Sequence, residues 1–232
     1  MGERSKELRL EVALEQLKKY FEEKSFTAKG LHFAMDMLSQ SPLPSHIRLF
    51  QNALNTGVLD HIGFGRRIGQ LVDALSRSGT EHGLEALRIV FADHNLFPKV
   101  VSTIRKSVFF NLISSNSDGA PHTINVGCKN GLLDTLEADV LQEALEKLLA
   151  KNHPETDEAF CSTIRRGATE FLSDEQIKDL KKAIKKLEPE RKTKLLGAFV
   201  DSKSANGKHT SETLQANRAT PTGPKRAPVL SD

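Results

Sequence analysis

Residues 34–57 read AMDMLSQSPLPSHIRLFQNALNTG, and residues 144–167 read ALEKLLAKNHPETDEAFCSTIRRG. Both segments carry an Ala, a Pro, a Phe, an aliphatic residue and a Gly at the same spacing. The matching positions are Ala34, Pro44, Phe50, Leu54 and Gly57 in the first segment, and Ala144, Pro154, Phe160, Ile164 and Gly167 in the second. The offset is about three periods of 37 residues. The match therefore predicts an internal repeat with intermediate copies.

A Gly or Asn marks one corner of each predicted copy. These residues are Gly57, Asn95, Gly131 and Gly167, and they are 38, 36 and 36 residues apart. Gly and Asn tolerate the left-handed conformation that ends many helices, so we predict positive φ at all four positions. The opposite ends of the copies are marked by Pro44, Gly79, Pro121 and Pro154, since Pro stops a helix or occupies its first turn.

Apolar residues recur at spacings of three and four between these corners, which is the pattern of helices that bury one face. The sequence has one Tyr, no Trp and little strand-like alternation. We therefore predict an all-α domain over residues 1–200, built as an α-solenoid of about five antiparallel helical hairpins with a period of about 36–38 residues. The secondary structure of Thr123–Lys129 (TINVGCK) is left undecided, because the segment fits a short helix, a strand or a loop.

Residues 68–90, IGQLVDALSRSGTEHGLEALRIV, resemble the hairpin of a pentatricopeptide-type repeat. The resemblance consists of an apolar pair at Leu71-Val72, a turn at Gly79 and Ala86-Leu87 opening the second helix. Ala144-Leu145 and Pro154 give a second, partial match. The similarity covers about one and a half units, and the unit length departs from a constant period. It implies a helical-hairpin repeat and raises RNA as a possible ligand, without placing base-reading residues.

The composition is that of an ordinary soluble chain. Its 232 residues include 33 Lys and Arg against 30 Asp and Glu, so the net charge is only +3. The first 25 residues carry 12 charges, so a secretory signal peptide is not expected. No stretch approaches the ~18 consecutive apolar residues of a membrane span. Residues 201–232 have no aromatic residue and many Ser, Thr, Asn and Pro, which predicts a disordered polar tail.

The motifs of common active sites are missing. None of the eight histidines lies in an H-E-x-x-H motif, and the chain has no G-x-S-x-G, Walker or dinucleotide-binding motif in a suitable context. The two cysteines, Cys128 and Cys161, are too few for a disulfide framework or a Cys-based zinc site and are interpreted as buried thiols. We therefore expect no catalytic residue, no metal and no cofactor.

The clearest polar feature is the segment 174–194, DEQIKDLKKAIKKLEPERKTK, which reads as a basic amphipathic helix. Ser173 is a candidate N-cap, and Ile177, Leu180, Ile184 and Leu187 form one apolar stripe. The candidate residues for binding an anion or a partner are Lys178, Lys181, Lys182, Lys185, Lys186, Arg191, Lys192 and Lys194. Two interpretations remain open: a solvated helix face, or a patch for phosphate backbones, an acidic protein or anionic lipid.

The repeat pattern and the near-neutral body favour a non-enzymatic scaffold that binds a protein partner on the concave face of the stack. This step rests on analogy at the level of the fold. The alternative is an RNA-binding repeat protein that uses the basic C-terminal helix, although one Tyr and no Trp leave few stacking side chains. A compact helical enzyme and a bacterial effector delivered to another cell are further alternatives. A cytoplasmic location is expected.

Overall fold

The computed structural model describes residues 2–41, 43–63 and 66–205. These residues form twelve α-helices, a five-residue π-helix and two three-residue 3-10 helices, and they contain no strand. The predicted all-α class is therefore confirmed for the part of the chain that is described. Helix α12 (Pro189–Ala205) runs five residues into the segment predicted as a tail. The remainder of that segment, 206–232, lies outside the described residues.

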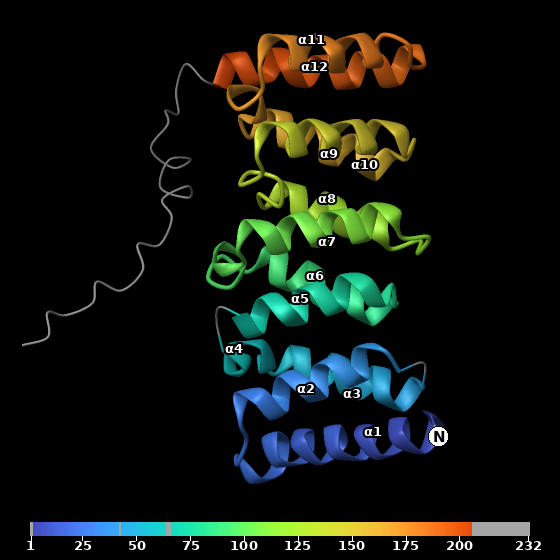
Figure 1. Ribbon diagram of the computed structural model, residues 1–232, viewed down its shortest axis with the longest axis vertical. Coiled ribbons are helices and arrows are strands. Elements are labelled where there is room, and N and C mark those ends of the chain that lie inside the picture. The colour runs from blue at the N-terminus through green and yellow to red at the C-terminus, as the bar shows by residue number, and fades with distance from the viewer. Residues whose placement is uncertain (1, 42, 64–65, 206–232) are drawn as a thin grey trace, which may run out of the picture.

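The long helices lie in two rows, and the chain alternates between them. The first row contains α2 (Ala28–Ser39), α5 (Arg66–Ser78), α7 (Ser102–Ser114), α9 (Ala138–Ala150) and α11 (Asp174–Ile184). The second row contains α3 (Pro44–Asn55), α6 (Glu81–Ala92), α8 (Ala120–Lys129), α10 (Pro154–Arg165) and α12. Each helix contacts the next helix in its own row and its sequence partner in the other row. Figure 1 shows the helices stacked in chain order along the long axis.

Helix α1 covers the first end of the stack, and shorter elements connect the rows. Helix α1 (Gly2–Lys18) and the π-helix Lys19–Glu23 precede the stack, and α1 packs against α2 at the end opposite α12 (Figure 1). The connections from the second row back to the first contain α4 (Val58–Ile62) and the 3-10 helices Phe97–Lys99 and Ala168–Glu170. The chain therefore makes similar short connections at three of its corners.

The core lies between the two rows. Apolar side chains from both rows are inaccessible to solvent, among them Leu71 and Phe109 in the first row and Phe50 and Phe160 in the second. They occupy the stripes that the spacing of three and four predicts, because such residues lie on one side of an α-helix. The buried residues form one continuous cluster from Ala13 to Phe199.

Helix α8 settles the segment that the sequence left open. Thr123–Lys129 is helical even though Thr123, Ile124 and Val126 are β-branched. Ile124 and Cys128 are buried between the neighbouring helices, and a Cβ on Gly127 would approach the Phe91 ring to 2.9 Å. Tertiary packing of α8 against α6 and α10 therefore overrides the local strand preference.

The predicted left-handed corners are confirmed at three positions and wrong at the fourth. Gly57, Gly131 and Gly167 have φ values of 78°, 91° and 92°. Asn95 does not have positive φ; the non-glycine residues with positive φ in the described part of the chain are Lys24 and Asn152. At the Asn95 corner, Asp93 Oδ1 instead accepts hydrogen bonds from the backbone N–H groups of Asn95 (2.7 Å) and Leu96 (2.9 Å). A side-chain cap thus replaces the left-handed residue.

A buried arginine ties two of these corners together. The Arg105 guanidinium donates hydrogen bonds to the carbonyl oxygens of Val100 (2.8 Å), Phe97 (3.1 Å) and Gly131 (3.2 Å). It also lies over the Phe97 ring, 4.4 Å from the centroid. Burial lowers the pKa of Arg105, and the neighbouring Asp134 opposes this effect. Arg105 therefore supplies a donor to the buried Val100 carbonyl and a second donor to the Phe97 and Gly131 carbonyls, which also accept the N–H groups of Val100 and Asp134.

Candidate partner-binding surface

The basic segment begins as the sequence predicts. Ser173 caps α11: its hydroxyl accepts the Gln176 N–H (3.2 Å), and the Gln176 side chain accepts the Ser173 N–H (2.8 Å). Asp174 and Glu175 lie in the first turn, where the helix dipole favours anions. Leu180 and Ile184 are fully buried. The helix is amphipathic, and its apolar side belongs to the core.

The prediction of one basic helix over residues 174–194 is wrong. Helix α11 ends at Ile184, a turn follows, and α12 begins at Pro189. A Pro has no N–H and disfavours helical geometry in the residue before it, so a continuous helix through Glu188 is disfavoured and the next helix begins with Pro189 in its first turn. The candidate cations are therefore divided between a first-row helix with its following turn and a second-row helix.

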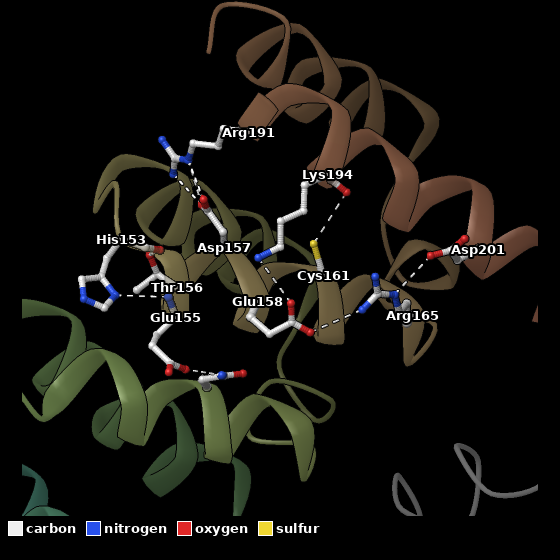
Figure 2. A network of polar contacts seen from close by, with 11 residues as sticks. His153, Glu155, Thr156, Asp157, Glu158, Cys161, Arg165, Arg191, Lys194 and Asp201 are labelled. Atoms are coloured by element: carbon white, nitrogen blue, oxygen red, sulfur yellow. Dashed lines mark hydrogen bonds and ion pairs between the residues drawn. The ribbon is translucent and has the colours of Figure 1, made fainter. Parts of the chain in front are cut away.

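Three of the eight candidate cations are engaged inside the protein. Arg191 Nε lies 2.8 Å from both carboxylate oxygens of Asp157, and its Nη2 donates to the Leu149 carbonyl at 2.6 Å (Figure 2). The side chains of Arg191 and Asp157 are only 13% and 10% exposed. Lys194 pairs with Glu158 at 3.4 Å, and Lys181 Nζ lies 4.9 Å from the Phe199 ring centroid. These contacts join α12 to α10 and α11; Arg191 is largely buried against Asp157, whereas the Lys194 side chain is still 43% exposed.

The same network extends along α10, as Figure 2 shows. Glu158 also pairs with Arg165 (3.5 Å), and Arg165 reaches Asp201 on α12 (3.3 Å). The Cys161 thiol faces the Lys194 carbonyl at 3.9 Å. The acidic side chains of α10 therefore neutralise part of the basic charge of the C-terminal hairpin, since opposite charges meet across the α10–α12 contact.

The acidic partners on α10 were missed by motif reasoning, although the sequence carries a signal for them. Asp157 and Arg191 are 34 residues apart, and Arg165 and Asp201 are 36 residues apart. Both separations are close to the period of 36–38 residues that the sequence pattern predicts. A search for opposite charges at this separation finds both pairs, and each pair joins α10 to α12.

A second polar cluster joins α8 to α10. Glu155 accepts a hydrogen bond from the Asn125 amide and lies 3.4 Å from His122 Nδ1. The Asn125 hydrogen bond lowers the pKa of Glu155, and the nearby His122 adds to the effect. The His153 ring caps α10 by accepting the Glu155 N–H at 3.1 Å. The cluster fixes the start of α10 against α8.

The remaining five candidate cations form no ion pair with another described residue. Lys178, Lys182, Lys185 and Lys186 are exposed, and Lys192 is half-buried. Lys178, Lys182 and Lys185 follow one another at spacings of four and three, which places them on one face of α11 and its C-cap. We call these three residues the lysine row. The structure therefore reduces the broad basic patch to one row with two flanking lysines.

The neighbouring helix in the same row carries the opposite charge. Helix α9 contacts α11 and exposes Asp139, Glu143 and Glu146. Asp139 accepts a hydrogen bond from Gln176 of α11 at 3.1 Å, and Glu143 pairs with Lys147 at 3.6 Å. Gln176 marks the side of α11 that faces α9, and Lys178, Lys182 and Lys185 come two, six and nine positions later, which places the lysine row on the side of α11 away from α9.

Both thiols are structural, as predicted. Cys128 and Cys161 are buried and unpaired. Burial raises the pKa of the Cys128 thiol to about 12 and that of Cys161 to about 11. A thiol is nucleophilic only as the thiolate, so neither group is activated for catalysis at neutral pH.

Residues 2–41, 43–63 and 66–205 contain no group of three or more His, Cys, Asp or Glu side chains placed to hold a metal ion. No helix in this described part of the chain is long and apolar enough to cross a membrane. Comparisons with protein-family models, with curated proteins and with solved structures found no match to the chain.

Proposed function

We propose that the chain is an α-solenoid of five antiparallel hairpins and acts as a non-enzymatic scaffold that binds a protein partner on its concave face. One observation carries the architectural part of the proposal. Successive long helices contact each other in order within each row, from α2 to α11 and from α3 to α12. This is the contact pattern of a repeat array, in which each unit touches only its neighbours.

Side-chain hydrogen bonds across the stack support the same architecture, because they join residues about one period apart. The pairs are Asp73 with Ser107 (2.6 Å), Ser76 with Asn111 (2.9 Å), Arg88 with Thr123 (3.1 Å) and Asp139 with Gln176 (3.1 Å). Their separations in sequence are 34, 35, 35 and 37 residues. Polar residues at recurring positions thus connect one hairpin to the next.

A chain that ends at Ser173 tests the architecture. In a solenoid the loss of the last hairpin removes neighbour contacts only from α9 and α10, so the other hairpins stay folded. We expect an unchanged helical signal per residue and a cooperative melt at lower temperature. If the shortened chain aggregates, hydrogen exchange on the full chain gives the answer: amides of α11 and α12 should open before those of α5 to α8. Simultaneous opening of all helices contradicts the solenoid.

The scaffold role is tested by affinity purification from cell extract, with one half of the extract treated with nuclease. A protein captured from both halves is then purified and titrated against the full chain by calorimetry. A stoichiometric complex of the two pure proteins supports the scaffold. A robust catalytic activity of the pure chain, lost on changing one or two polar residues, contradicts it.

RNA binding is the second candidate, and it is favoured by the five lysines of the C-terminal hairpin that form no ion pair with another described residue. Lysines bind phosphate as point charges, and such binding falls steeply with salt. The same purification separates the two candidates. Capture that disappears after nuclease treatment supports RNA, and capture that survives supports a protein.

A further inference from the structure

We propose that the lysine row on α11 is a docking site for an extended, acidic polypeptide segment of a protein partner. This inference rests on the scaffold function proposed above and names the chemistry of the segment that would be recognised. Lys178, Lys182 and Lys185 are exposed, share one face and form no ion pair with another described residue. Their charges are therefore available to an approaching anion.

The lysine row differs from the neighbouring cations, which contact groups of α10 or α12. Arg191 and Lys194 are bound to carboxylates of α10, and Lys181 is held over a ring of α12. Arg191, the arginine of the C-terminal hairpin, is thus bound to Asp157, and the cations that form no ion pair with another described residue are lysines. An array without a free guanidinium binds anions as point charges, without the planar bidentate hydrogen bonds that Arg forms with carboxylate or phosphate.

The spacing of the row fits an extended acidic strand. Residues four apart in a helix rise by about 6 Å, and residues two apart in an extended strand advance by about 6.6 Å. Carboxylates at alternate positions of an extended peptide therefore match the spacing of Lys178 and Lys182. Lys182 and Lys185 are three residues apart and rise by only about 4.5 Å, and the flexible stems of the lysines allow them to reach the next carboxylate. From Lys178 to Lys185 the row is about 10 Å long, which matches a short segment.

A membrane surface is a poorer occupant, because the apolar side of α11 is already used. Leu180 and Ile184 are fully buried in the core, and Ile177 is half-buried against it. An amphipathic helix that adsorbs to lipid inserts its apolar face into the boundary of the bilayer. Helix α11 has no such face to offer without leaving the stack.

A nucleic acid is also a poorer occupant. Single strands gain much of their affinity by stacking bases on aromatic side chains. The aromatic residue of α11 and α12 is Phe199, which is 4% exposed and covered by Lys181. A longer polyanion that passes the N-terminal end of the row meets Glu175 and Asp179. The surface therefore fits a short acidic segment better than a continuous phosphate backbone.

Charged neighbours set the limits of the site. Lys186 and Lys192 extend the positive charge beyond the C-terminal end of the row, whereas Glu175 and Asp179 lie beside its N-terminal end. An acidic segment is attracted toward the end near Lys185 and repelled from the end near Glu175. We therefore expect a preferred register along α11.

The test uses the full chain and a fluorescein-labelled peptide of alternating Glu and Ser, about ten residues long. Binding is followed by anisotropy at about 50 mM and about 200 mM salt. The triple variant Lys178→Glu, Lys182→Glu and Lys185→Glu removes the row. The control has the same change in charge at exposed lysines of α1, α2 and α7: Lys18→Glu, Lys29→Glu and Lys106→Glu. A second triple variant with Gln in place of Glu covers the case in which charge reversal unfolds α11.

We expect salt-sensitive binding by the parent chain, about tenfold weaker binding by either row variant, and a change of about twofold or less in the control. Circular dichroism confirms that the variants are folded. Equal loss in row and control variants overturns the proposal, as does tighter binding of oligouridine or of vesicles with anionic lipid than of the peptide.

The failure of this inference differs from the failure of the scaffold function. If a purified protein partner binds the row variants as well as it binds the parent chain, the scaffold stands and the lysine row is not the site. If the parent chain forms no complex with any purified protein, the scaffold function fails whatever the peptide shows.

Discussion

The corner that follows α6 and the corner that follows α8 achieve the same reversal by different chemistry. After α8, Gly131 is left-handed, with φ 91°, and the Leu132 N–H donates to the Gly127 carbonyl at 2.9 Å. This is the hydrogen bond of a Schellman cap. After α6, the Asp93 carboxylate accepts two backbone N–H groups. One corner depends on backbone conformation and the other on a side-chain hydrogen-bond acceptor.

The two corners share the apolar residues that follow the turn. Leu96, Phe97 and Val100 are buried after the first, and Leu132, Leu133 and Leu136 are buried at equivalent places after the second. The feature that both corners share is therefore this apolar triplet. The turn residue changes because several local solutions direct the same triplet into the core.

Arg105 is expected to give the largest effect, since it joins both corners. Replacement with Met removes three hydrogen bonds from a buried charged donor and leaves the Val100 carbonyl without that donor, while the Phe97 and Gly131 carbonyls keep a backbone N–H. We expect a loss of about 3 kcal/mol or more in the free energy of unfolding. Urea unfolding measures it. The control is Arg77→Met, whose side chain is 64% exposed and pairs with Asp73; there the expected loss is below about 1 kcal/mol. Equal losses contradict a special role for Arg105.

Gly131→Val should destabilise the glycine corner by about 2 kcal/mol, because a β-branched residue is strained at positive φ. A Cβ there would also lie 2.7 Å from Asp134 Oδ2. The rate of thiol labelling shows which part of the chain opens. Cys128 lies three residues before the corner and should be labelled faster in the variant, whereas the labelling rate of Cys161 should change less. Gly167→Val should lower stability by more than about 1 kcal/mol for the same conformational reason. Unchanged unfolding in both variants contradicts this account of the corners.

Asp93→Ala should weaken the other corner by about 1 kcal/mol, because two backbone N–H groups lose their acceptor. The corresponding Asp93→Asn variant keeps a side-chain oxygen and should recover part of the loss. Thermal unfolding of the two variants under identical conditions measures the difference. If Asp93→Asn lowers stability as much as Asp93→Ala does, the contribution of Asp93 comes from its charge and not from the hydrogen bonds of the turn.

Asn95→Ala should have the smallest effect, within about 0.5 kcal/mol, because Asn95 is not left-handed. Asn152 is the matched position, with φ 49°, and there the change to Ala should cost about 1 kcal/mol. Paired denaturant titrations compare the two variants. A larger loss at Asn95 than at Asn152 reverses the conformational argument.

Much of the fold was predictable because it depends on local pattern. Apolar residues at spacings of three and four define helices whatever the neighbours are, and Gly57, Gly131 and Gly167 are suited to a backbone conformation that other residues resist. Asn95 was misjudged because Asn is compatible with that conformation without requiring it. The break at Glu188 carried a local signal in the following Pro189, but the continuous run of charge obscured it.

The candidate site was predictable only in part. The sequence by itself determined that the C-terminal segment is helical, basic and amphipathic, since these properties follow from residue type and spacing. Only the tertiary structure decided which cations are free. Arg191 and Lys182 belong to the same basic run, yet Arg191 is bound to Asp157 and Lys182 is exposed. The physical reason is that charge pairing depends on distance in space, and the partners of this run lie on α10, one hairpin away.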